Sequence, residues 1–355
     1  MPQTAKRINW IDMAKGYGML FVILGHIGDF GEFAFFKTWF FSFHMPLFFF
    51  LSGYVFKEYD CFKTFLKKKV KGIIVPYFCL GIPMILFQML WDFKSHTLTV
   101  QSGLDLVLKF LLQRRLWTIW FLTCLFLLSL VFYLLKKLIK SDLILAIVSI
   151  VLPAAGTLYY HLGGRPLFWN LDVCMMAFPF FFAGYYVKKH RERIHTILEN
   201  KQDLILFLLA SLAINIAMCV LNAQLGGDWF NMFSNDYGIV PITFISAFAG
   251  IGFIIAVSKL ATFRLIRYIG ENSILYLAWH EVIMLPIAEK ILIVGCAVVH
   301  ISYDNLFILL HYAIILVLIV AFLTVCSLII SKTGLRVILG KSNPPKSHQK
   351  SAADR

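Results

Sequence analysis

The chain has 355 residues, of which 60% are hydrophobic and 15% are charged, and its formal net charge is +14. A helix needs roughly 20 apolar residues to cross a hydrocarbon core about 30 Å thick, and runs of that length recur from end to end, which excludes a soluble globular protein. The composition therefore predicts an all-α, polytopic transmembrane helix bundle. Membrane orientation explains the positive charge without a nucleic-acid partner.

About ten transmembrane helices are predicted from these apolar runs. Along the chain they lie near residues 13 to 28, 38 to 56, 73 to 91, 117 to 135, 143 to 160, 170 to 187, 204 to 222, 238 to 257, 274 to 294 and 306 to 330. Residues 1–330 are predicted to form one membrane domain, followed by a polar, disordered cytoplasmic tail over 331–355.

The distribution of lysine and arginine predicts how the bundle is oriented. Most of the 33 basic residues fall in segments on the same side as the N-terminus, and the opposite side holds only Lys37, Lys94, Lys109, Arg114, Arg115, Arg165 and Lys290. Because cytoplasmic loops retain Lys and Arg, both termini are predicted to be cytoplasmic. The expected location is the cell membrane, with the lipid bilayer as a partner and the oligomeric state open.

The first predicted span, WIDMAKGYGMLFVILGH, contains Asp12, Lys15 and His26. An ionisable group at membrane depth costs about 2.5 to 3.5 kcal/mol on insertion scales, so each of these needs a reason. Lys15 and His26 are eleven residues apart, close to three turns, and share a helix face at a separation of roughly 16 Å. Lys15 is alternatively an interfacial anchor. His26 is either a structural hydrogen-bonder or a group for proton transfer near neutral pH.

The second span includes FSFHMPLFFFLSGY, in which His44, Pro46, Ser52 and Gly53 interrupt an aromatic run. Proline bends a helix and small residues allow close helix packing, which is the favoured interpretation of Pro46, Ser52 and Gly53. His44 stays open between a packing hydrogen bond and a role in a site.

The loop after the second span, KEYDCFKTFLKKKVKGIIVPY, is polybasic and includes Lys68, Lys69 and Lys71. Such a juxtamembrane run is commonly an orientation signal alone. Clustered ammonium groups also attract phosphates, so a phosphorylated cytosolic ligand is the alternative interpretation.

Polar residues return in the ninth span. Asn272, a candidate helix cap, stands at its inner end, and the adjacent His280 and Glu281 are better suited to an aqueous pocket than to lipid. Two outer segments, GGRPLFWN and NAQLGGDWFNMFSNDY, combine aromatic and polar residues in a way that suits a sugar-binding surface. The seven cysteines form no CxxC pair, and no metal site is predicted.

The order of these motifs resembles integral-membrane acyltransferase family 3, in particular its fucose 4-O-acetylase-like branch. The matching stretches are WIDMAKGYGMLFVILGH, FHMPLFFFLSGY, a basic stretch ending VPY, IWFL and IGENSILYLAWH. The resemblance covers about residues 8 to 330. It implies an O-acyltransferase that takes an acyl group, most often acetyl, from cytosolic acyl-CoA and delivers it to a hydroxyl of a cell-surface or lipid-linked carbohydrate, without a bound cofactor.

The resemblance implies that His26 and Lys15 are the catalytic residues, with lysine standing where many members have arginine. His26 is expected to act as a general base on the acceptor hydroxyl or as a transient acyl carrier. The residues expected to bind substrate are Asp12, His44, Ser52, Asn272 and His280. Three of them are candidate hydrogen-bond donors to the oxyanion of the intermediate: His44, Ser52 and Asn272.

The phosphates of acyl-CoA are expected to dock on Lys68, Lys69 and Lys71. Many members carry Arg-x-x-Arg before the third span, and here Lys69 and Gly72 occupy those positions. Lys68 and Lys71 have the same spacing one residue earlier.

A transporter or flippase for a lipid-linked saccharide is the competing hypothesis, because intramembrane His, Asp and Glu residues suit that class too. The sequence shows no clear internal repeat or matched pair of broken helices, which would favour it.

Overall fold

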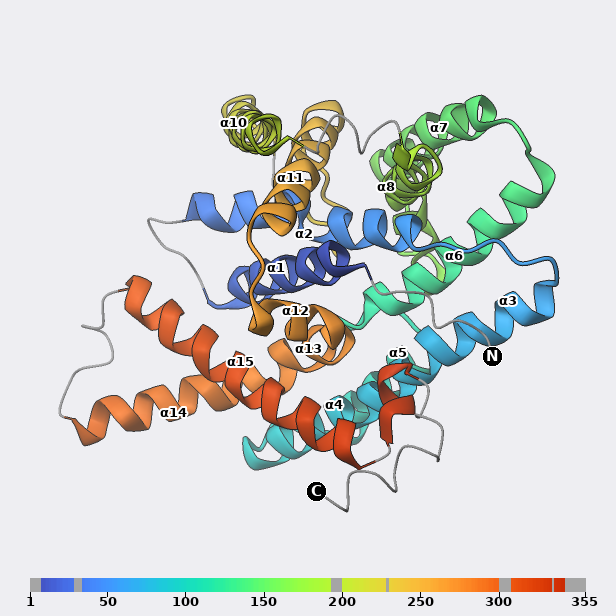
Figure 1. Cartoon of the computed structure of the whole chain (residues 1–355). Coiled ribbons are helices and arrows are strands. Elements are labelled where there is room, and N and C mark those ends of the chain that lie inside the picture. The colour runs from blue at the N-terminus through green and yellow to red at the C-terminus, as the bar shows by residue number, and fades with distance from the viewer. Residues whose placement is uncertain are drawn as a thin grey trace, which may run out of the picture.

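The computed structural model describes residues 8–28, 34–192, 200–227, 230–299, 308–333 and 335–341. Over these residues the chain is a helix bundle (Figure 1), and the only strand-like pairing is a single bridge between Asn231 and Asp236. The predicted all-α fold is confirmed.

The α-helices are α1 (Asn9–His26), α2 (Ala34–Tyr54), α3 (Phe62–Lys69), α4 (Val75–Lys94), α5 (Val100–Leu111), α6 (Trp120–Leu138), α7 (Asp142–His161), α8 (Leu171–Lys189), α10 (Lys201–Gln224), α11 (Val240–Leu260), α12 (Arg264–Glu271), α13 (Ser273–Trp279), α14 (Leu285–Val298) and α15 (Ile308–Lys332). Two short π-helical turns, η2 (Val70–Ile74) and η4 (His280–Met284), continue into α4 and α14. The 3₁₀ turns are η3 (Phe168–Asn170) and η6 (Leu335–Leu339).

Each of the ten predicted spans coincides with a long helical stretch. Eight stretches among the described residues are long and apolar enough to cross a membrane. The other two predicted spans are α1 and the continuous run from α13 through η4 to α14, and both contain ionisable residues: Asp12 and Lys15 in the first, and Glu281, Glu289 and Lys290 in the second. The two most polar of the predicted spans are therefore helical as well. Helices α3, α5 and α12 lie in segments predicted as loops.

Aromatic side chains from α2, α6 and α8 fill the centre of the bundle. Phe43, Phe49, Phe132, Phe178 and Phe181 are fully buried. Helices α2 and α8 cross in backbone contact, because a Cβ on Gly53 would collide with the carbonyl oxygen of Phe181, and one on Gly184 with that of Phe50. The packing interpretation of Gly53 is thus correct for this crossing.

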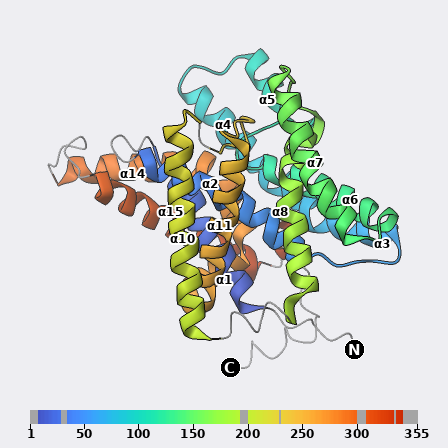
Figure 2. The same cartoon turned by 90° about the horizontal axis from the view of Figure 1, so that it is seen from above.

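A second close crossing joins α1 to α12. A Cβ on Gly270 would collide with the backbone carbonyl of Asp12, and one on Gly16 with that of Ile266. Asp12 is buried at this crossing and Lys15 is half-buried. Seen from above, α10 and α11 pack side by side, while α14 and α15 extend to one side of the bundle (Figure 2).

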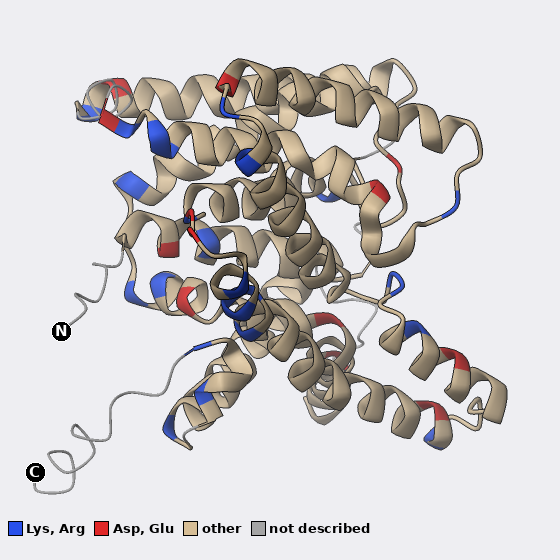
Figure 3. Cartoon of the chain, turned by 90° about the vertical axis from the view of Figure 1, so that its right-hand side faces the viewer, with Lys and Arg blue, Asp and Glu red and all other residues tan. Residues whose placement is uncertain are grey.

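Lysine and arginine gather at one end of the bundle, with fewer at the opposite end (Figure 3). The last turns of α6, α8, α11 and α15 all contain lysine. This matches the charge asymmetry expected from the sequence, and the assignment of the basic end to the cytoplasm stays a prediction. We call the basic end the inner end and the other the outer end.

The chain stays ordered beyond the predicted domain boundary at 330. Helix α15 continues to Lys332, and after η6 the Lys341 ammonium donates a 2.6 Å hydrogen bond to Oδ1 of Asn272. This described part of the predicted tail packs against the bundle. Residues 342–355, which the sequence predicts to be disordered, lie outside the described residues.

Candidate active site

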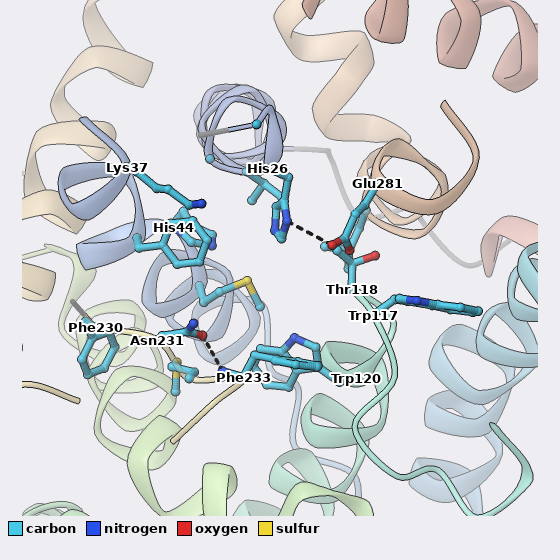
Figure 4. A pocket seen from close by; sticks show the side chains of 17 residues that line it. His26, Lys37, His44, Trp117, Thr118, Trp120, Phe230, Asn231, Phe233 and Glu281 are labelled. Atoms are coloured by element: carbon cyan, nitrogen blue, oxygen red, sulfur yellow. Dashed lines mark hydrogen bonds and ion pairs between the residues drawn. The ribbon is translucent and has the colours of Figure 1, made fainter. Parts of the chain in front are cut away.

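A cavity of about 610 Å³ lies at the outer end of α1 (Figure 4). Its walls come from α1, α2, the segment before α6, the segment between α10 and α11, α13 and η4. The lining residues used below are His26, Lys37, Phe41, His44, Trp117, Thr118, Trp120, Phe230, Asn231, Phe233 and Glu281. The volume is in the range of small-molecule sites.

His26 is the last residue of α1 and faces Glu281 across the cavity wall. Its Nδ1 lies 3.4 Å from Oε1 of Glu281, and both side chains are partly exposed to the cavity. A carboxylate only accepts hydrogen bonds, so Nδ1 carries the proton and donates it, and the lone pair of the neutral ring is at Nε2.

A π-turn places the two neighbours His280 and Glu281 together against α1. Pro286 has no backbone N–H to continue the α-helical pattern, and just before it the N–H of Leu285 bonds five residues back to the carbonyl of His280. Within the wider turn both side chains reach His26: Glu281 through its carboxylate, and His280 with its ring centroid 5.1 Å away. Such turns recur at functional sites.

His280 lies behind His26 and does not line the cavity. It is 1% exposed, and its Nδ1–H donates to the carbonyls of Tyr276 at 2.8 Å and Leu277 at 3.1 Å. Its Nε2 is buried and has no hydrogen-bond partner among the described residues. The ring is therefore fixed in one tautomer, with an unused lone pair beside the His26–Glu281 pair.

His44 is fixed in the same way on α2. Its Nδ1–H donates to the carbonyl of Phe40 at 2.8 Å, and its ring packs edge-on against Phe41 at 4.7 Å. The neutral ring can therefore only accept a hydrogen bond at Nε2. This geometry does not suit the oxyanion-donor role considered for His44, but it does suit binding of a substrate hydroxyl.

A buried charge network fixes the segment from Phe230 to Tyr237, which forms one wall of the cavity. The Arg115 guanidinium donates to the carboxylate of Asp172, to Oδ1 of Asn235 at 2.8 Å and to the carbonyl of Phe233 at 2.8 Å. Nδ2 of Asn235 also donates to Asp172 at 2.7 Å, and the Tyr237 hydroxyl donates to Oδ1 of Asn235. The outer loops are therefore tied to the start of α8.

Three of the predicted site residues come together: His26 and His44 line the cavity, and His280 packs against His26. Four lie elsewhere. Along α1, Lys15 is about three turns and Asp12 about four turns from His26. Ser52 donates at 2.7 Å to the carbonyl of Phe48 in its own helix. Asn272 donates at 2.8 Å to the carbonyl of Tyr268 and accepts from Lys341.

The three lysines of the predicted phosphate site differ in exposure. Lys68 and Lys71 are exposed, with Lys68 lying 4.6 Å over the ring of Tyr59. Lys69 points inward and donates at 3.1 Å to Ser129, which is fully buried. Lys68 and Lys71 are therefore placed to meet a ligand from solvent.

Sequence reasoning did not single out Lys37, Thr118 or Asn231, and it recognised Glu281 only as a pocket-lining residue. Lys37 was counted among outer basic residues, although it precedes His44 by seven residues and so lies on the same face of α2. For Asn231, the only signal in the sequence was the aromatic and polar character of its segment, which indicated a surface that binds a ligand.

A family model described as an acyltransferase domain, Acyl_transf_3, matches residues 8–332. Comparisons with curated proteins and with solved structures found no significant match. The model covers nearly the whole chain, including every helix that contributes to the cavity. The chain belongs to acyltransferase family 3 and is a multi-pass membrane protein.

Proposed function

We propose that the chain is an O-acetyltransferase that moves acetyl from cytosolic acetyl-CoA to a hydroxyl of a cell-surface or lipid-linked carbohydrate. The observation that carries this proposal is the His26–Glu281 pair in the wall of the outer cavity. Family membership supports acyl transfer in general. The acetyl donor and the carbohydrate acceptor are the parts that we add.

The pair has the parts of a general base. Glu281 holds the Nδ1–H of His26, which leaves Nε2 to accept the proton of a hydroxyl bound in the cavity. The carboxylate and the C-terminal end of α1 both stabilise the imidazolium that forms. We assign His44 to accept a hydrogen bond from a second hydroxyl of the acceptor, because its Nδ1–H is bonded to Phe40 and its ring lines the cavity.

In the proposed reaction, the acceptor oxygen attacks the thioester carbonyl as its proton passes to Nε2 of His26. A C–O bond forms, and the tetrahedral intermediate collapses with cleavage of the C–S bond. The thiolate of CoA takes the proton back from His26, so that CoA and the acetyl ester are the products. The buried hydroxyl of Thr118 lines the cavity without a described partner and is a candidate donor to the oxyanion.

Transient acetylation of His26 itself is the second route to the same products. Nε2 would attack the thioester first, and the acceptor hydroxyl would then attack the acetyl-imidazole. Both routes require the same Nε2 lone pair.

The donor is proposed to enter from the inner end. Lys68 and Lys71 are exposed there and suit the phosphates of acyl-CoA, whereas Lys69 already has Ser129 as a partner. Lys15 lies on α1 between that end and His26, so we assign it to binding the donor, with Asp12 nearby on the same helix. The thioester must extend between helices for roughly 16 Å from the level of Lys15 to His26.

The test uses membranes that contain equal amounts of wild-type protein, His26→Ala or His161→Ala, supplied with acetyl-labelled acetyl-CoA and a broad glycan pool. His161 ends α7 on an exposed surface and is the matched control. We expect the label in carbohydrate to fall about 10²- to 10⁴-fold for His26→Ala only, with CoA released in step with transfer. Transfer that survives His26→Ala would refute the mechanism. Saccharide movement without CoA release would favour a flippase.

A further inference from the structure

The polar groups that line the outer cavity are dominated by hydrogen-bond donors. Oδ1 of Asn231 accepts from the backbone N–H of Phe233 at 3.0 Å and of Ser234 at 3.4 Å, so its amide N–H groups remain for a ligand. The indole N–H groups of Trp117 and Trp120 donate to none of the described residues. The hydroxyl of Thr118 adds a further donor.

The charged residues of the cavity lie apart from one another. Among its described lining residues, Lys37 is the only lysine or arginine and Glu281 the only carboxylate. The Glu281 carboxylate is engaged by His26. The two charges lie on different walls of the cavity, Lys37 on α2 and Glu281 beside His26 (Figure 4). An ammonium group on the α2 wall, in a cavity rich in donors, suits a ligand that is rich in oxygen and carries a negative group facing that wall.

The position of Lys37 fits a substituent on the acceptor. Lys37, Phe41 and His44 are spaced four and three residues apart, so all three lie on one face of α2, and Lys37 points into the cavity (Figure 4). Its backbone is roughly 10 Å along the helix from that of His44. This separation is within the reach of a group on the same sugar unit or its neighbour. Lys37 is half-buried, which weakens solvent screening of its charge.

Aromatic rings supply the apolar surface that a carbohydrate-binding site needs. Trp117, Trp120, Phe230 and Phe233 also line the cavity, and Arg115 donates a hydrogen bond to the carbonyl of Phe233. Their apolar faces suit the C–H face of a sugar ring, while the donors at the edge suit its oxygen atoms.

We propose that the acceptor is an anionic carbohydrate, bearing a carboxylate or a phosphate, and that Lys37 and Asn231 bind that group. This inference rests on the proposed acetyl transfer and assigns a specificity to the same cavity. Lys37 selects the acceptor and is not required for the chemical step.

The test starts from the glycan pool of the labelling assay. Labelled products are separated by anion exchange into anionic and neutral fractions for wild-type protein, Lys37→Gln, Lys37→Arg and Lys109→Gln. Lys109 on α5 is the matched control, because like Lys37 it is partly buried, it lies outside the cavity, and it pairs with Asp105 at 2.6 Å. Carboxyl reduction or phosphatase treatment of the pool before the reaction distinguishes a carboxylate from a phosphate.

Wild-type label is expected in the anionic fraction and should be lost after one of the two treatments. Lys37→Gln should lower this label at least about tenfold at low acceptor concentration, with recovery at saturating acceptor. Lys37→Arg should retain most of the label, because it keeps the charge, and Lys109→Gln should resemble wild type.

Label confined to the neutral fraction would overturn the anionic acceptor while leaving acetyl transfer intact. An equal loss for Lys37→Gln at low and saturating acceptor would overturn it too, because Lys37 would then serve the reaction centre. Absence of both label and CoA release with wild-type protein would instead refute the proposed function.

Discussion

Both ends of α1 carry ionisable residues, but their surroundings differ. At the outer end, His26 faces Glu281 in a cavity whose walls are tied together by a buried charge network around Arg115. At the inner end, Asp12 is buried where α1 crosses α12 in backbone contact at Gly270. The outer end of α1 thus faces a cavity with room for a ligand, whereas at the inner end Asp12 is enclosed by the neighbouring helix.

The largest effect on the outer end is expected from removal of the Arg115 guanidinium. Arg115→Gln leaves the buried Asp172 carboxylate without its cation, which we expect to cost about 3–5 kcal/mol of stability. The neighbouring Arg114 is exposed, so Arg114→Gln is the control. Thermal unfolding in detergent should show a large fall in melting temperature for Arg115→Gln and none for Arg114→Gln. Equal stability of the two variants would mean that the network does not hold the cavity wall.

At the inner end, the crossing of α1 and α12 should be sensitive to the size of the residue at position 270. Gly270→Ala places a methyl group against the backbone of Asp12 and forces α1 and α12 apart, which we expect to cost about 1–3 kcal/mol. Gly295→Ala adds the same methyl where no atom lies within 4 Å, and it is the matched control. The two melting temperatures are to be compared under identical conditions. A Gly270→Ala variant as stable as Gly295→Ala would show that this crossing is looser than described.

The smallest effect is expected at Ser52, a predicted substrate ligand. Its hydroxyl donates to the carbonyl of Phe48 within α2, and Ser52 does not line the outer cavity. Ser52→Ala should therefore change acetyl transfer less than about twofold and stability by less than about 0.5 kcal/mol. A substantial rise in the KM for either substrate would restore Ser52 to the site.

The sequence predicted the spans well because a run of about 20 apolar residues is a local property of the chain. It also singled out His26 and His44, which line the cavity, because histidine is conspicuous in an apolar helix. The pairing of His26 with Glu281 depends on how α1 meets a π-turn that lies 255 residues later in the chain, which no local pattern contains. The hydrogen bond from the Ser52 hydroxyl to the carbonyl of Phe48 likewise becomes visible only in the folded helix.

The Arg115–Asp172 pair at the outer end is a second contact that local sequence patterns do not predict. Arg115 was counted as a loop charge and Asp172 as a residue at the start of a span, and their contact joins segments that are 57 residues apart. The helical spacing of Lys37 and His44 can be read from the sequence. That both residues line one cavity is visible only in the folded structure.

The central claim is that His26 and Glu281 act as one unit. Its most direct test is a double-mutant cycle of acetyl-transfer rates for wild type, His26→Ala, Glu281→Gln and the double variant, at equal protein and saturating substrates. We expect each single change to lower the rate by about 10² or more, and the double variant to be no slower than His26→Ala, because Glu281 acts through the histidine. Independent losses that multiply in the double variant would contradict the account.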